Sequence, residues 1–274
     1  MGLRVNSNIS SINAQRNLVT TTDRLQKSLQ RLSSGLRISR AADDAAGLGI
    51  SESFRAEIRS LQQAQRNAND GISLLQIAEG ALNETSSILI RLRELAIQSA
   101  NGTLGQEERA TVNLEFQGLL DEVDRIAAIT EFNGLQILQS GSAITFQVGT
   151  GATSNDRFTV SAVNATASAI GIAGLGVSTA SGALSALALL DSAVGVVAGL
   201  RASFGTAQNR LESAIRSIAI AVENTAAADS RIRDVDFASE TAELTRNQVL
   251  QQAGISVLAQ ANVSTQSALS LLQG

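Results

Sequence analysis

The chain has 274 residues and a formal net charge of −4, and it contains no Cys, His, Trp, Tyr or Pro. Without Cys and His it lacks a disulfide framework, thiolate chemistry, and the common catalytic bases and zinc ligands. At an average usage of about 5%, roughly fourteen prolines would be expected, and because proline breaks helix interiors, their absence is compatible with very long helices.

The acidic residues do not suggest a catalytic centre. Asp43 and Asp44 are adjacent in the sequence, as are Glu107 and Glu108. Neighbouring residues on a helix do not share a face, so paired carboxylates are not expected to converge there. We therefore expect no enzymatic activity, no cofactor and no metal.

Charge is unevenly distributed between the two ends. Residues 1–40 hold seven Lys or Arg against Asp23 alone, a net charge of +6, and residues 235–274 have a net charge of −2. This asymmetry favours attraction between the ends, with a solvated basic face as the alternative. The basic end has no aromatic residues for base stacking, so no nucleic-acid binding is expected.

No targeting or membrane segment is expected. Residues 1–20 lack the apolar core of about 7–15 residues and the small-residue cleavage site of a signal peptide. No uninterrupted run of about 18 apolar residues is present, so membrane insertion is not expected. An exported chain of this kind would need a route that reads no such signal.

Both ends carry apolar residues at helical spacing. Near the start these are Leu18, Leu25, Leu29, Leu32 and Leu36, and near the end they are Leu244, Ile255, Leu258, Leu269 and Leu272. Such spacing places them on one helical face. Apolar helical termini need a partner, which is either the other terminus or another copy of the chain.

The first half of the chain predicts three helices. The first spans residues 4–32 and is followed by a connector at 33–47. The second spans 48–99 with two apolar stripes; about fifty residues would extend roughly 75 Å. The third spans 105–129, with a capping box formed by Thr103 and Gln106 at its start and Asn133-Gly134 at its end.

The period then changes to that of a strand. Residues 144–148 and 157–163 alternate between apolar and polar side chains, which predicts one β-hairpin. Residues 164–182 are mostly small and predict a surface loop.

Helix returns at residues 183–228, with Gly195, Gly199 and Gly205 inside it. Each glycine weakens a helix by about 1 kcal/mol relative to alanine, so close packing is expected to offset them. A charged connector at 229–238 and a last helix at 239–272 complete the chain.

The predicted fold is mainly α: a long antiparallel helical bundle or coiled-coil rod with one small β-hairpin and paired N- and C-terminal helices. If the chain folds back at the hairpin, the two connectors lie side by side.

Several runs of sequence are long and specific: LQKSLQRLSSGLRISRAADDAAGLGISE at 25–52, RLRELAIQSANGT at 91–103, FNGLQIL at 132–138, QNRLESAI at 208–215, SRIRDVDFASETAELTRNQVLQQAGISVLAQAN at 230–262 and LSLL at 269–272. In this order they closely resemble bacterial flagellin, the subunit of the flagellar filament. The resemblance covers about residues 1–140 and 183–274.

The resemblance implies a division into domains. Residues 1–47 and 229–274 would form a D0-like terminal helix pair with connectors, which lines the inner tube of the filament. Residues 48–138 and 183–228 would form a D1-like helical rod in the outer tube. Residues 139–182 would be a short variable region, where larger flagellins carry outer domains and many carry O-linked glycans; a plain solvated loop is the alternative.

The resemblance also implies a function and partners. We expect a secreted, extracellular structural protein that self-assembles into a helical polymer of many copies and serves swimming motility. It would leave the cell unfolded through type III export and fold on assembly. Its partners would be an export chaperone at the C-terminal helix, filament cap and hook-junction proteins, and a host innate immune receptor.

Two groups of site residues follow from the resemblance. Assembly would use Leu25, Leu29, Leu32, Leu244, Ile255, Leu258, Leu269 and Leu272 of the terminal helices. The run at 91–95 matches the segment read by the host Toll-like flagellin receptor, so that receptor would contact Arg91, Leu95, Glu115, Leu190 and Val194. Packing between subunits explains the same face without a receptor.

Two alternatives remain at this point. A hook–filament junction protein has similar end helices but less of the run at 230–262. A membrane-active amphipathic protein, such as a secreted pore-former, also fits the apolar stripes.

Overall fold

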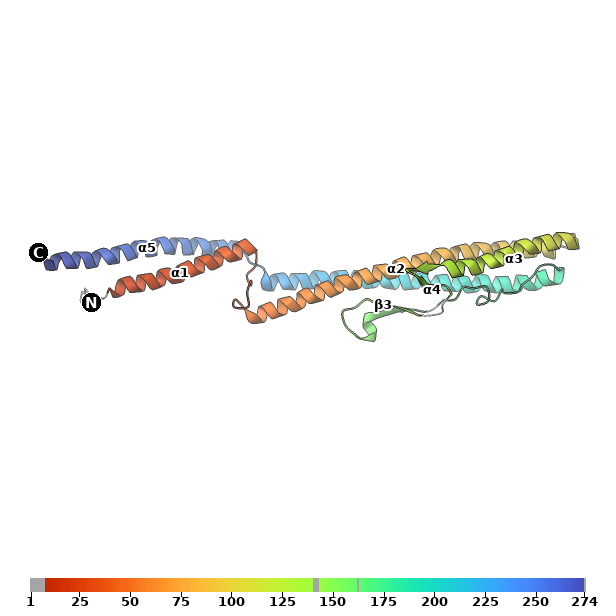
Figure 1. The fold of residues 1–274 in the computed structure, drawn as a ribbon, viewed down its shortest axis with the longest axis horizontal. Helices are drawn as coiled ribbons and strands as arrows, with labels where there is room; N and C mark the ends of the chain where they lie inside the picture. The colour runs from red at the N-terminus through yellow and green to blue at the C-terminus, as the bar shows by residue number, and fades with distance from the viewer. Residues whose placement is uncertain (1–7, 140–142, 162, 274) are drawn as a thin grey trace. The chain divides into compact units, whose positions relative to one another are not determined.

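The computed structural model describes residues 8–139, 143–161 and 163–273, with side chains described as far as Val263. The chain divides into two compact units, a terminal-helix unit of Met1–Ala56 with Asn224–Gly274, and a central unit of Glu57–Glu223. The fold is mainly helical, as predicted (Figure 1). Its helices are α1 (Ile9–Ser34), α2 (Ala45–Ala100), α3 (Gln106–Ile129), α4 (Ala180–Arg233) and α5 (Phe237–Gln273).

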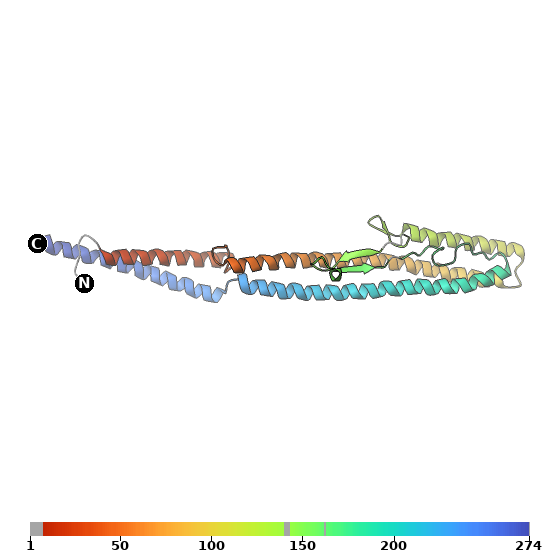
Figure 2. The ribbon, with the colours of Figure 1, turned by 90° about the horizontal axis from the view of Figure 1, so that it is seen from below.

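In the terminal-helix unit, α1 and α5 lie side by side and antiparallel (Figures 1 and 2). The amide of Asn8, at the start of α1, donates to the carbonyl of Ala261 near the end of α5 at 2.9 Å. At the opposite end, Arg31 lies 3.5 Å from Glu240. The predicted pairing of the N- and C-terminal helices is therefore confirmed.

The two connectors of this unit are joined by backbone hydrogen bonds. Helix α1 ends at Gly35, whose positive φ of 71° suits a residue without a Cβ. Leu36 and Asp234 then form an antiparallel bridge, and the Val235 N–H donates to the Gly35 carbonyl at 3.0 Å. The connectors lie side by side, as expected for a chain that folds back on itself.

The second connector is much shorter than predicted. Helix α4 continues to Arg233 and α5 begins at Phe237, so only residues 234–236 separate them, whereas a connector at 229–238 was expected. The carboxylate of Asp236 accepts the backbone N–H of Ala238 at 2.9 Å and starts α5. The charged residues up to Arg233 belong to the end of α4, because a solvated helix end can have the same composition as a connector.

In the central unit, α2, α3 and α4 pack together around one continuous core (Figure 2). The core is built from seven-residue repeats, as in a coiled coil. In α2 the buried repeat in this core is Ala68, Leu75, Leu82, Leu89 and Ala96; in α4 it is Ala183, Leu190, Val197, Phe204 and Leu211. Phe116 of α3 is fully buried in the same core. One repeat further along, Leu61 and Ile218 form a smaller, separate cluster with Ala64.

The predicted hairpin is present, and a second strand pair accompanies it. Strand β3 (Ile144–Gln147) pairs antiparallel with β4 (Arg157–Val160). The additional pair is β1 (Glu131–Phe132) with β2 (Leu135–Gln136). Its turn is Asn133-Gly134, with φ of 50° and 77°, the left-handed pair that a tight hairpin requires. The sequence predicts a helix end at this dipeptide, but α3 ends at Ile129 and the dipeptide forms the turn of the strand pair.

Two local predictions are wrong. The N-cap of α3 is Gly105, which forms no side-chain capping bond, so the expected Thr103–Gln106 capping box is absent. A Cβ added to Gly195, Gly199 or Gly205 would meet nothing within 4 Å beyond the backbone of its own helix and its chain neighbours, so close packing within the described chain does not offset these glycines.

The segment between the hairpin and α4 is not the bare surface loop that its composition suggested. Ile170, Ile172 and Val177 are buried in the central core. Polar side chains of α3 hold the segment from beneath: Asp124 accepts the backbone N–H of Ala167 at 2.7 Å, and Asn113 accepts that of Val177 at 2.8 Å. Small residues allow this segment to lie close to the helix.

Candidate functional site

The predicted assembly residues of the terminal helices fall into two groups. Four are half-buried, namely Leu25, Leu32, Leu244 and Leu258. Leu29 and Ile255 are 49% and 54% exposed. Leu269 and Leu272 lie outside the residues whose side chains the structure describes.

The seam between α1 and α5 explains this division. Its buried positions are small or polar, including Ser11, Ala14, Ser28 and Asn247. Gly254 continues this pattern, because a Cβ built on it would lie 3.4 Å from Leu18. The leucine stripes therefore pair with each other only in part, and their remaining surface faces away from the seam.

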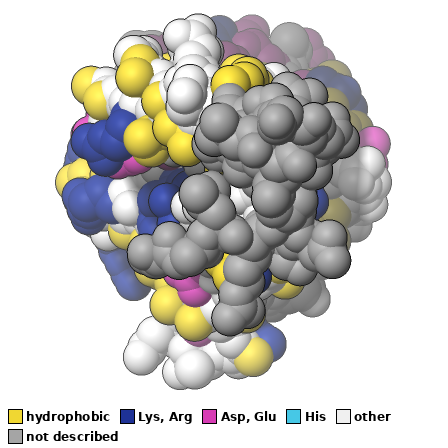
Figure 3. Space-filling model, turned by 90° about the vertical axis from the view of Figure 1, so that its left-hand side faces the viewer, with side chains coloured by type: hydrophobic (Ala, Val, Ile, Leu, Met, Phe, Trp, Pro, Cys, Tyr) yellow, Lys and Arg dark blue, Asp and Glu magenta, His cyan; other side chains and the backbone are white. Residues whose placement is uncertain are grey.

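The terminal-helix unit leaves many large apolar side chains exposed. Besides Leu29 and Ile255 they are Ile9, Ile12, Val19, Ile50, Phe237, Val249, Leu250, Val257 and Val263. Figure 3 faces the end that carries the chain termini, where hydrophobic and basic side chains are exposed beside the residues drawn in grey. Exposed apolar surface of this extent marks an interaction surface.

Helix α4 also exposes apolar surface. It contains a window long and apolar enough to cross a membrane by length and composition alone, and only 28% of that window is buried. This qualifies the expectation that no segment meets that criterion. One such helix is weak support for a membrane span, because helices of soluble proteins pass the same test. Leu184, Leu189 and Val196 are 61%, 44% and 45% exposed on it.

Among the predicted receptor-contacting residues, Arg91 and Glu115 form an exposed ion pair between α2 and α3. Arg91 Nη2 and Nε lie 2.8 Å and 3.1 Å from the same Glu115 oxygen, and Nη1 lies 3.0 Å from Glu94. These hydrogen bonds raise the pKa of Arg91 above its ordinary value, and the bond to Glu115 has the largest effect. In this conformation the guanidinium of Arg91 bridges Glu94 and Glu115 on the surface.

The other predicted contacts are less accessible. Leu95 and Leu190 are 1% and 0% exposed and belong to the central core, and Val194 is half-buried. In this conformation Leu95 and Leu190 support the surface from beneath and cannot touch a partner directly. Their helical periodicity places them inward, which a match of sequence runs does not reveal.

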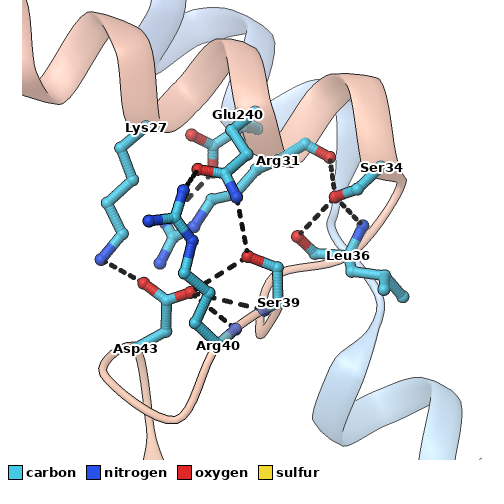
Figure 4. A network of polar contacts seen from close by, with 9 residues as sticks. Lys27, Arg31, Ser34, Leu36, Ser39, Arg40, Asp43 and Glu240 are labelled. Carbon is cyan, nitrogen blue, oxygen red and sulfur yellow. Dashed lines mark hydrogen bonds and ion pairs between the residues drawn. The ribbon is translucent and has the colours of Figure 1, made fainter.

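Sequence reasoning missed a polar network that joins the first connector to α1 (Figure 4). Lys27 Nζ lies 2.7 Å from Asp43. The other oxygen of Asp43 accepts the Ser39 hydroxyl at 3.3 Å and the Arg40 backbone N–H at 3.3 Å. The hydrogen bond from Lys27 is the main cause that lowers the pKa of Asp43 to about 2. Opposite charges in the sequence were the only signal of this contact.

The described residues form no group of three or more His, Cys, Asp or Glu that could hold a metal ion.

Comparison with known protein families identifies the chain. The model of the bacterial flagellin N-terminal helical region matches residues 5–143, and that of the C-terminal helical region matches residues 187–272. The chain belongs to the bacterial flagellin family.

Relatives of this flagellin match over nearly their whole length. It is 45% identical to a flagellin of Halalkalibacterium halodurans and 43% identical to the flagellar filament 30.7 kDa core protein of Treponema maltophilum, with 98% of this chain and 99% of each relative covered. These names favour a filament subunit over the hook–filament junction protein considered above.

A solved flagellin shares part of the fold. The crystal structure of Bacillus cereus flagellin is 32% identical, with a TM-score of 0.51, and the alignment covers 56% of this chain and 88% of that one.

Family membership establishes the general function. This flagellin is a structural subunit, not an enzyme, and its family polymerises into the bacterial flagellar filament, an extracellular structure of motility.

Proposed function

We propose that this flagellin orders its terminal helices as it joins the filament. The D0-like parts, residues 1–47 and 229–274, would form the inner tube, and the D1-like parts, 48–138 and 183–228, the outer tube. Residues 139–182 would be the variable region. The division of the chain after Ala56 and before Asn224 supports this assignment.

The observation that carries the proposal is the composition of the α1–α5 seam. It buries mainly small and polar residues, whereas Val19, Leu29 and Ile255 are exposed. Fixing the backbone costs about 1–2 kcal/mol per residue, and small seam residues return little of this through apolar burial. Contacts with neighbouring subunits supply the remainder, so folding and assembly are coupled.

Export also depends on when the terminal segments fold. A chain whose terminal segments order only on assembly passes unfolded through a type III export apparatus. An export chaperone covers the C-terminal segment until then, because its apolar side chains would otherwise associate. Hook-junction and filament cap proteins receive the chain at the ends of the polymer.

A truncation tests the proposal. Removal of residues 240–274 should leave a soluble, exportable monomer that does not polymerise on filament seeds, measured by sedimentation and electron microscopy. Filaments formed by the truncated chain would refute the role of α5.

Matched point variants of exposed α5 positions refine the test. Ile255→Asp should block seeded growth, whereas Gln252→Asp introduces the same charge at a polar position and should slow growth much less. Equal effects of the two variants would show that added charge, and not lost apolar contact, governs assembly.

We further propose that the monomer is recognised by the host Toll-like flagellin receptor through the surface around Arg91 and Glu115. Both side chains are about half exposed and hold each other in position. Leu95, Leu190 and Val194 would shape the surface from beneath. Subunit packing would use the same face, so the receptor would bind monomers and not filaments.

Charge reversal tests the receptor surface. Arg91→Asp should abolish receptor signalling by monomers, measured in cells that carry the receptor. Arg125→Asp is the matched control, because Arg125 also forms a surface ion pair, with Glu122 on α3. Unchanged signalling after Arg91→Asp, with helix content confirmed by circular dichroism, would overturn the assignment.

A further inference from the structure

A small polar pocket lies between α1 and α5, apart from the exposed apolar surfaces. Its volume is about 220 Å³, enough for several water molecules or a small ion. The lining residues come from both helices: Arg24, Lys27, Ser28, Arg31, Glu240, Glu243 and Asn247.

Donors in this pocket lack partners. Ser28 and Asn247 are each only 5% exposed, and neither side chain forms a hydrogen bond with any described residue. Arg31 Nε is the one polar side-chain atom among the described pocket residues that is fully buried without an acceptor. Buried polar groups are nearly always paired, so the unpaired Arg31 Nε points to an acceptor supplied from outside the chain. The polar atoms of Ser28 and Asn247 open onto the pocket beside the buried Arg31 Nε, so donors from both helices are available to a ligand there.

The charges around the pocket indicate the sign of the charge that a ligand would carry. Lys27 is paired with Asp43 outside the pocket at 2.7 Å. Glu243 lies 2.5 Å from Arg246, which does not line it. Both of these charges are therefore already balanced.

The remaining charges leave an excess of positive charge. Arg31 and Glu240 face each other at 3.5 Å, and Arg24 forms no ion pair with any described residue. A guanidinium, a hydroxyl and an amide can all donate hydrogen bonds to an oxygen acceptor. This combination suits an anion better than water or a cation.

We propose that the pocket is an oxyanion-binding site that joins α1 to α5. The anion accepts hydrogen bonds from Arg24, Ser28 and Asn247 and also supplies an acceptor for the Nε of Arg31. Two sources share this chemistry: a free anion such as inorganic phosphate, or a carboxylate side chain of a second copy of the chain. The inference concerns the folded helix pair and does not depend on when that pair folds.

The first arm of the test measures free anion on filaments of the full chain. Filaments are equilibrated with radiolabelled inorganic phosphate in a buffer without other oxyanions and are then sedimented. A free anion predicts saturable binding that approaches one phosphate per subunit. Binding should be at least tenfold weaker in Arg24→Gln and Asn247→Leu filaments and unchanged in Arg16→Gln, a control at an exposed position of α1 outside the pocket.

The second arm identifies a carboxylate from a neighbour. If no phosphate binds, cryo-electron microscopy of the same filaments should show a carboxylate of another subunit within hydrogen-bond distance of Arg24 and Asn247. Its removal by an Asp→Asn or Glu→Gln change should weaken filaments as much as Arg24→Gln does. Absence of phosphate binding together with a pocket that holds only water would overturn the proposal. So would Asn247→Leu filaments that bind phosphate as wild type does.

Discussion

Lys27 and Asp43 form an ion pair of 2.7 Å that ties the first connector back onto α1 (Figure 4). The pKa of Asp43 is about 2 in the folded chain, below its ordinary value of 3.8. A lowered folded pKa stabilises the fold above the unfolded value, and this contribution is lost as the pH falls from about 4 to 2. Because Lys27 is half exposed, we expect a contribution of about 1 kcal/mol or less.

This pH dependence can be measured by light scattering of filaments heated at a series of pH values between 5 and 2. Asp43→Asn should lower the melting temperature at pH 5 and flatten its dependence on pH below about 4. Asp23→Asn is the control, since Asp23 forms no ion pair with a described residue. An identical pH profile for wild type and Asp43→Asn would contradict the prediction.

Alanine substitutions at two glycines of α2 should have opposite effects on the stability of the monomer. A Cβ on Gly71 would lie 3.2 Å from Leu211 and 3.3 Å from Phe146, whereas nothing lies within 4 Å of one on Gly80. Overpacking costs about 1–3 kcal/mol and should outweigh the helix gain of about 1 kcal/mol at Gly71. Thermal unfolding of monomers should show a lower melting temperature for Gly71→Ala and a higher one for Gly80→Ala. A shift in the same direction for both variants would show that the core around Gly71 rearranges to accept the added methyl group.

Two leucines of α4 should separate folding from assembly. Leu211 is fully buried, so Leu211→Ala should lower the free energy of unfolding of the monomer by about 2–5 kcal/mol. Leu184 is 61% exposed, so Leu184→Ala should change monomer stability by about 0.5 kcal/mol or less and raise the critical concentration for polymerisation. Denaturant unfolding and sedimentation measure the two effects. A normal critical concentration for Leu184→Ala would exclude that position from subunit contacts.

The Asp124 carboxylate should stabilise the conformation of the segment between β4 and α4. Its carboxylate accepts the Ala167 N–H at 2.7 Å, and a hydrogen bond to a charged group contributes about 1.5–3 kcal/mol. Asp124→Ala should therefore speed hydrogen exchange around Ala167 by at least tenfold, measured by mass spectrometry. Asp121→Ala, an exposed neighbour on α3, should leave this exchange unchanged; equal protection in both variants would assign the order to apolar burial alone.

The sequence determined the positions of the helices. Seven-residue repeats such as Leu75–Leu82–Leu89 mark a buried face, and the absence of proline leaves the helices uninterrupted. Alternation over Ile144–Gln147 and Arg157–Val160 likewise located the main hairpin. These features depend on neighbours a few residues apart, which a local pattern records directly.

Only the tertiary structure decided which surfaces are covered. Periodicity shows that Leu29, Ile255 and Leu95 are apolar positions of helices, but the first two are exposed and the third is buried. The difference depends on contacts between residues far apart in the chain, such as Ser11 with Asn262 at 3.0 Å. Whether a helix face is free for a neighbouring subunit therefore depends on where the chain folds back, which no local spacing encodes.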